Sequence, residues 1–109
     1  MEKNLSEAVK LYTQAVEKGN TDAMNNLGYC YKYGQGVEKD PSEAVKLYTQ
    51  AVEKGHATAM YNLGDCHEDG LCGLSVDVSE ARRLYRMAAE KGQSHAITAL
   101  ARLDRNNAP

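Results

Sequence analysis

The chain has 109 residues, 42% of them apolar, and a formal net charge of −2, which is the composition of a single globular domain. The near balance of charge argues against a nucleic-acid binder, and no apolar run approaches the length of a membrane span. Three cysteines are too few for a disulfide scaffold. The first ten residues begin an amphipathic pattern at once, so we expect no signal peptide and a cytoplasmic protein.

The sequence repeats itself. Residues 6–19 and 42–55 both read SEAVKLYTQAVEKG, at a spacing of 36 residues. A third copy, SEARRLYRMAAEKG, follows at 79–92 with one extra residue in the preceding loop. Self-similarity at this period predicts an array of stacked structural units. We expect a single repeat domain over 1–109, divided into repeats at 4–38, 39–75 and 76–109, the last of them a terminal repeat.

The first predicted helix covers 5–18. Asn4 and Glu7 have the spacing of a capping box, and Gly19 is placed to end the helix in a left-handed conformation. Apolar side chains recur at helical spacing and form one stripe, made of Ala8, Leu11, Tyr12, Ala15 and Val16.

The second predicted helix covers 22–33 and has Ala23, Leu27 and Cys30 on its apolar side. Gly28 lies inside it, and a glycine there costs about 1 kcal/mol relative to alanine. The same cost recurs at Gly64 in the next repeat. We therefore expect two backbones to approach closely at this position.

The later helices are predicted by the same signals over 41–54, 58–69, 78–91 and 95–104. Their N-caps are Asp40 and Asp77, and glycines again follow the helices at 55 and 92. Neither helix of a pair can bury its stripe alone, so the pairs are expected to stack into an all-α solenoid of six helices. The equivalent tyrosines Tyr12, Tyr48 and Tyr85 should each be buried between their own helix pair and the next pair.

The repeat resembles the Sel-one-like repeat family, which is related to the tetratricopeptide repeat. The matching residues are Ala23, Leu27-Gly28, Tyr31, Gly34-Gln35-Gly36-Val37, Asp40, Ala44, Tyr48, Ala51 and Gly55. The resemblance implies right-handed superhelical stacking of three helix-turn-helix repeats and an adaptor or scaffold role in protein assemblies. The family pattern contains no catalytic residues to transfer, and we expect no enzyme and no cofactor.

The cysteines are interpreted as structural. Cys30 and Cys66 are equivalent, and the third repeat has Leu103 at the same position, as expected for a core site. The stretch 66–72 also contains Cys72 and other metal-binding residue types, but it lacks the ligand spacing of a zinc site. We predict no metal here, with a zinc site around 66–72 as the alternative.

The first helices also carry a polar ladder opposite the apolar stripe. In tetratricopeptide-like stacks the first helices line the concave groove, so the ladder is a candidate binding surface; the alternative is an ordinary solvated helix face. The partner-binding residues proposed from the ladder are Lys10, Gln14, Lys46, Gln50, Arg83 and Met87. Arg86 is added to them, because it replaces the equivalent Thr13 and Thr49 beside the ladder.

Charge is unevenly distributed along the chain. Residues 1–77 contain 7 Lys and 12 acidic residues, net −5, whereas 78–109 contain 5 Arg, 1 Lys and 3 acidic residues, net +3. We therefore expect a protein or peptide partner with a carboxylate near Arg83 and Arg86 and an apolar side chain against Met87. The alternative is a self-assembling unit, in which the acidic end of one copy meets the Arg-rich end of another.

Overall fold

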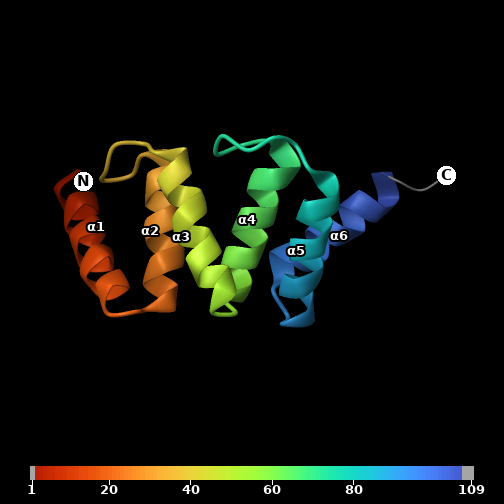
Figure 1. The fold of residues 1–109 in the computed structure, drawn as a ribbon, viewed down its shortest axis with the longest axis horizontal. Coiled ribbons are helices and arrows are strands. Elements are labelled where there is room, and N and C mark those ends of the chain that lie inside the picture. The colour runs from red at the N-terminus through yellow and green to blue at the C-terminus, as the bar shows by residue number, and fades with distance from the viewer. Residues whose placement is uncertain (1, 107–109) are drawn as a thin grey trace. The chain divides into compact units, whose positions relative to one another are not determined.

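The computed structural model describes residues 2–106, and within that range it contains six α-helices and no strand (Figure 1). This confirms the all-α repeat fold and the number of predicted helices. The helices are α1 (Glu2–Glu17), α2 (Thr21–Tyr33), α3 (Pro41–Glu53), α4 (Ala57–Asp69), α5 (Val78–Glu90) and α6 (Ser94–Asn106).

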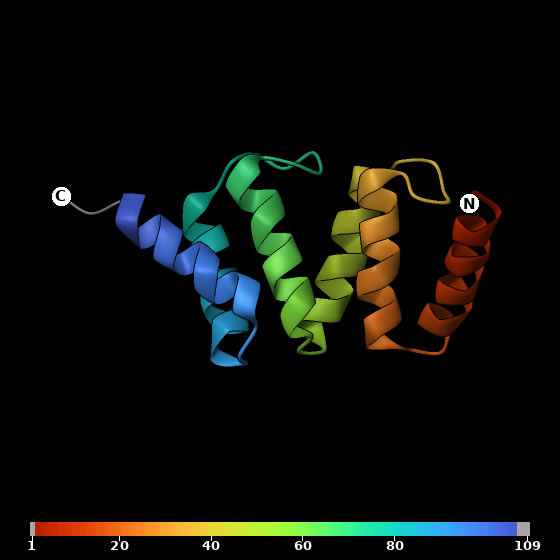
Figure 2. The same cartoon turned by 180° about the vertical axis from the view of Figure 1, so that it is seen from behind.

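The helices group into two compact units, Met1–His56 and Ala57–Pro109. In the first unit, α2 packs on both α1 and α3, and α2 and α3 lie side by side in both views (Figures 1 and 2). In the second unit, α5 packs on both α4 and α6. Each unit therefore contains a second helix packed against the first helix of the following repeat. The single domain over 1–109 stays a prediction.

Two of the three predicted N-caps are confirmed. Asp40 accepts a hydrogen bond from the Glu43 amide (3.2 Å), and Asp77 accepts one from the Glu80 amide (3.0 Å). The third is wrong, because α1 already begins at Glu2 and Asn4 lies inside its first turn. Glu and Lys are good helix formers, and no glycine or proline precedes position 4 to stop the helix.

The helix ends follow the glycines where these are present. Gly19, Gly55 and Gly92 have φ values of 85°, 84° and 85°, the left-handed conformation predicted for them. α6 has no such glycine, and it continues to Asn106, two residues beyond its predicted end.

The interior glycines of α2 and α4 each accommodate a buried aromatic ring. A Cβ added at Gly28 would lie 2.8 Å from Cε1 and 2.9 Å from Cδ1 of Tyr48, and Gly64 has the same relation to Tyr85. The close approach expected at these positions therefore exists, but its nearest atoms belong to a ring. The neighbouring backbone comes no closer than the Ala44 carbonyl oxygen, 3.4 Å from the added Cβ at Gly28.

The expected surroundings of the three tyrosines need correction. Tyr48 and Tyr85 are fully buried, but each packs on the second helix of the preceding repeat, where we expected the next one. Tyr12 is only half-buried. The physical reason is that within residues 2–106 no helix precedes α1 to supply the glycine surface that the other two tyrosines use.

The identical segments 6–19 and 42–55 therefore lie in different environments. Leu11 in α1 is 62% exposed, whereas its equivalent Leu47 in α3 is 4% exposed. Four apolar residues of α3 are buried, and none of the residues 4–17 is. Sequence alone sets the helix, but the neighbouring helix decides whether its apolar stripe becomes core.

Candidate partner-binding surface

The first unit contains a cavity of about 610 Å³ that draws on all three of its helices. We call it the Met24 cavity. Its lining residues are Val16, Glu17, Gly19, Met24, Gln50, Glu53 and Lys54. The cavity lies where the end of α1 and the start of α2 face the last turns of α3, so the short Lys18–Asn20 turn fixes its geometry.

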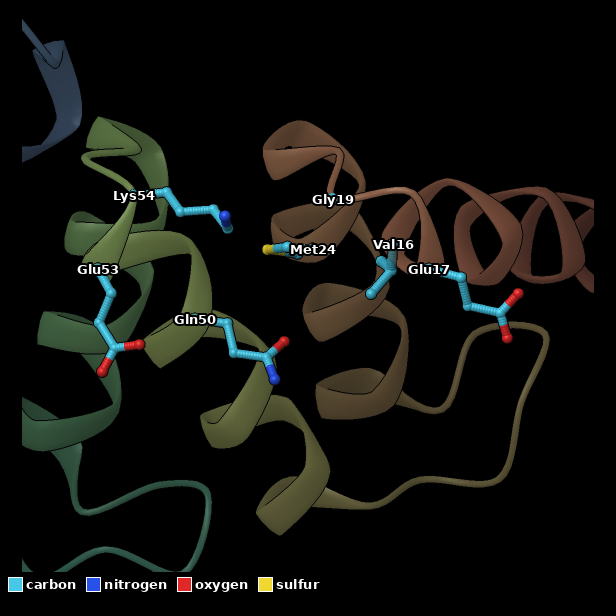
Figure 3. Close-up of a pocket in the computed structure, with 7 residues that line it drawn as sticks. All are labelled: Val16, Glu17, Gly19, Met24, Gln50, Glu53 and Lys54. Atoms are coloured by element: carbon cyan, nitrogen blue, oxygen red, sulfur yellow. The ribbon is translucent and has the colours of Figure 1, made fainter.

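Two apolar side chains, Val16 and Met24, line the cavity together with polar and charged ones (Figure 3). The side chains of Met24, Gln50 and Lys54 point into the shared space, and those of Glu17 and Glu53 point away from it. Met24 is 5% exposed, so only a small part of its flexible thioether faces the cavity. The Gln50 amide can both donate and accept a hydrogen bond, and Lys54 supplies a positive charge. This arrangement suits an apolar side chain flanked by a peptide group.

Of the four proposed partner-binding residues in the first unit, only Gln50 lines the cavity. Lys10, Gln14 and Lys46 are exposed on the helix surfaces. The Lys46 ammonium lies 3.8 Å from Glu43, a contact at the outer limit of an ion pair. The structure thus separates two residues, Gln14 and Gln50, that identical sequence contexts make equivalent.

In the second unit the predicted residues Arg83, Arg86 and Met87 all lie on α5. Arg83 is already paired, because its guanidinium donates to both carboxylate oxygens of Glu80 at 2.9 and 2.6 Å. Its remaining nitrogen lies 3.2 Å from the Met87 sulfur. The Arg83 guanidinium holds the pKa of the Glu80 carboxyl below its ordinary value. A partner carboxylate at Arg83 would have to displace Glu80.

Other arginines of the last repeat are also engaged within the unit. Arg82 pairs with Asp104, and Arg102 with Glu68. Arg86 is exposed, and within residues 2–106 no ion pair involves it. Arg86 is therefore the most accessible positive group beside Met87 for an incoming carboxylate.

A partly buried polar network in the second unit could not be found from the sequence. The Tyr85 hydroxyl donates to Glu68 (2.7 Å), and the Arg102 guanidinium donates to both oxygens of Glu68 at 2.5 and 2.7 Å. Chiefly because Arg102 donates to it, the pKa of Glu68 lies below its ordinary value, and burial raises that of Tyr85. Glu68 and Arg102 are 34 residues apart in the sequence. The first repeat has Lys32 and Tyr29 at the equivalent positions, so the repeat pattern does not indicate the pair.

The side chains and helices of the described residues also bear on metal binding and on membrane insertion. In residues 2–106, no three His, Cys, Asp or Glu side chains come together as a group that could hold a metal ion. Over the same range, every helix is too short or too polar to span a bilayer.

The sequence is similar to that of a known repeat family. The sequence pattern of the Sel1 repeat matches residues 1–20, 21–56 and 57–93, most of the chain. The chain belongs to the Sel1 repeat family. The second and third matched segments are the pairs α2–α3 and α4–α5, which are the helices that pack a tyrosine on a glycine.

Solved structures of Sel1 repeat proteins share this fold. A Sel1 repeat protein from Oxalobacter formigenes is 36% identical, with a TM-score of 0.82 over 90% of this chain and 39% of that one. A protective antigen of uropathogenic Escherichia coli strains, described as displaying an SLR fold, is 25% identical, with a TM-score of 0.81 over 98% of this chain and 26% of that one. The chain thus spans well under half of either relative. No curated protein sequence matches it. Sel1 repeat proteins generally mediate protein–protein interactions and are typically non-enzymatic.

Proposed function

We propose that this Sel1 repeat chain is a non-enzymatic adaptor module that holds an extended segment of a protein partner against the first helices of its repeats. The Met24 cavity carries the proposal, since it is a recess in the first unit where Val16 and Met24 lie beside polar and charged side chains. Its volume lies in the range of ligand-binding pockets. An apolar side chain of the partner would rest on Met24 and Val16.

Gln50 would fix the partner's backbone. A side-chain amide that points into a recess can donate to a peptide carbonyl and accept from a peptide N–H, which holds an extended strand without reading its side chains. Lys54 would favour an acidic residue next to the apolar anchor. In the second unit, Arg86 and Met87 would form a separate contact for a carboxylate and an apolar group. We expect about micromolar affinity from so small a surface.

The test is a displayed peptide library selected against the purified chain, followed by calorimetry of the best peptide. Gln50→Ala should weaken binding about 5- to 10-fold, the loss of one hydrogen bond. Gln14→Ala is the matched control, because it makes the same change in the identical sequence segment outside the cavity. Equal effects of the two changes, or none from either, would remove the cavity from the proposal.

The acidic preference is tested separately. Arg86→Glu should reduce the selection of acidic peptides and weaken the best acidic peptide about tenfold, because it replaces a favourable charge contact with a repulsive one. Lys39→Glu places the same charge reversal on an exposed loop residue of the first unit and should have a smaller effect. Peptides without acidic preference, or unchanged binding to the Arg86 variant, would refute the carboxylate contact.

Head-to-tail self-assembly is the other hypothesis. Ala101 on α6 disfavours the arrangement in which α1 of one copy packs on α6 of another. Stacking α1 of one copy on α6 of another would bring Tyr12 to Ala101, the equivalent of Gly28. A Cβ at Gly28 would lie only 2.8 Å from the packed Tyr48 ring. Ala101 therefore obstructs the arrangement that the interior repeats use. A molecular mass that rises with concentration and falls in high salt would favour self-assembly over peptide binding.

A further inference from the structure

Two cysteine sulfurs meet at the end of α4. Cys66 lies in the last turns of the helix and is 0% exposed, and Cys72 lies in the following loop and is 9% exposed. Their Sγ atoms are 2.8 Å apart, and both residues are in the reduced form. The two residues are six positions apart and belong to the same compact unit.

The loop backbone holds Cys72 in an unusual conformation. Its φ is 62°, and it is the only non-glycine residue with positive φ in the described part of the chain. The equivalent residue in the first repeat is Gly36, with φ 71°. Cysteine thus occupies a left-handed position that glycine would adopt without strain. Replacing glycine at that position gives the loop a sulfur that reaches α4.

Backbone hydrogen bonds tie the loop to the helix on both sides of Cys72. The Leu71 amide donates to the Cys66 carbonyl (2.9 Å), and the Asp77 amide donates to the His67 carbonyl (2.8 Å). The sulfurs are therefore held together by the fold before any bond joins them. Cys30, the equivalent of Cys66 in the first repeat, has no cysteine in its loop.

We propose that Cys66 and Cys72 are a reversible dithiol–disulfide pair that fastens the α4–α5 loop to α4. The oxidant is a small disulfide such as oxidised glutathione. The Cys72 thiolate, the more exposed of the two, attacks one sulfur of the reagent, breaks its S–S bond and releases one thiol. The Cys66 thiolate then attacks the Cys72 sulfur and releases the second thiol. Both protein thiols have lost their protons, and two electrons have passed to the reagent.

The bond would constrain the loop that leads into α5. It closes a ring over residues 66–72, and five residues later Asp77 caps the helix that carries Arg86 and Met87. Oxidation removes conformations from the unfolded chain and holds the start of α5 in place. The oxidised form should therefore be the more stable one.

The experiment equilibrates the full chain with oxidised and reduced glutathione, unfolds it, alkylates the free thiols and measures the intact mass. The wild-type chain should change from three alkylated thiols to one, with a peptide map showing Cys66 joined to Cys72. Its melting temperature should rise by about 10 °C on oxidation. Three alkylated thiols at every ratio, stable glutathione adducts, a bond to Cys30, or an unchanged melting temperature would each overturn the proposal.

Two variants keep the result interpretable. Cys72→Gly restores the residue of the first repeat and relieves the left-handed position, so it should fold, keep two alkylated thiols and show no oxidation-dependent melting temperature. Cys30→Ala removes a buried thiol from the other unit and should leave the bond intact, with no thiol alkylated after oxidation. A disulfide in the Cys72→Gly variant, or none in the Cys30→Ala variant, would also overturn the proposal.

Discussion

Leu11 and Leu47 provide a stability experiment with an internal control. They occupy the same position in two identical fourteen-residue segments, 6–19 and 42–55. A Leu→Ala change therefore alters the local helix propensity equally at the two sites. Truncation removes three carbons, each contributing about 0.8 kcal/mol when fully buried. Scaled by exposures of 62% and 4%, the transfer cost is about 0.9 kcal/mol at Leu11 and about 2.3 kcal/mol at Leu47. A cavity left at the buried site raises its total to about 3 kcal/mol or more.

The measurement is a urea titration of the two variants and the wild-type chain at one temperature, in which the circular dichroism signal of the helices reports unfolding. Leu47→Ala should lower the free energy of unfolding by about 2 kcal/mol more than Leu11→Ala. Equal losses would refute the reasoning, because identical helices would then be stabilised by the segment itself, whatever packs on it. A larger loss at Leu11 would mean that its side chain is covered in solution.

Three further predictions concern the second unit. Gly64→Ala should destabilise it by about 1 kcal/mol, because overpacking on Tyr85 outweighs the gain in helix propensity. Ala101→Gly, at an exposed position of α6, should cost about 1 kcal/mol through helix propensity alone, and thermal melting of both variants measures the two effects. Tyr85→Phe should cost about 1 kcal/mol in urea unfolding by removing the hydroxyl that donates to Glu68. Because Arg102 lowers the pKa of Glu68 in the folded state, this pair stabilises the fold above the unfolded pKa, and that stability is lost as the pH falls through the lower folded pKa. Arg102→Gln should therefore make the loss of stability shallower as the pH falls below the ordinary pKa of a glutamate, measured by unfolding at each pH.

Local signals were sufficient for most of the fold. Helix starts depend on capping residues such as Asp40 and Asp77, and the ends of the first helices depend on the glycines that follow them. These effects act within a few residues, so the local sequence is enough to predict them. Asn4 shows the limit of this reasoning. A capping residue marks a helix start only when the preceding residues are unable to extend the helix, and Glu2 and Lys3 extend it readily.

The candidate site was less accessible from the sequence. Helical spacing placed Gln14 and Gln50 on the same face, but only packing among three helices forms a cavity at Gln50. The clustering of arginines in the last repeat was visible, yet their partners Glu68 and Asp104 come from separate helices. A count of charges along the chain therefore overstates the number of arginines that are free to bind a partner's carboxylate.

The repeated segment also bears on how the chain assembles. Residues 6–19 and 42–55 are interchangeable in sequence, and α2 offers one glycine-centred surface to which the second of them is docked. The Lys18–Asn20 turn is too short to carry α1 to the opposite side of α2 in its own chain, but α1 of another molecule has no such restraint. At high concentration during refolding, α1 of one molecule can therefore compete with α3 of another for the same surface of α2, which is a route to intermolecular association.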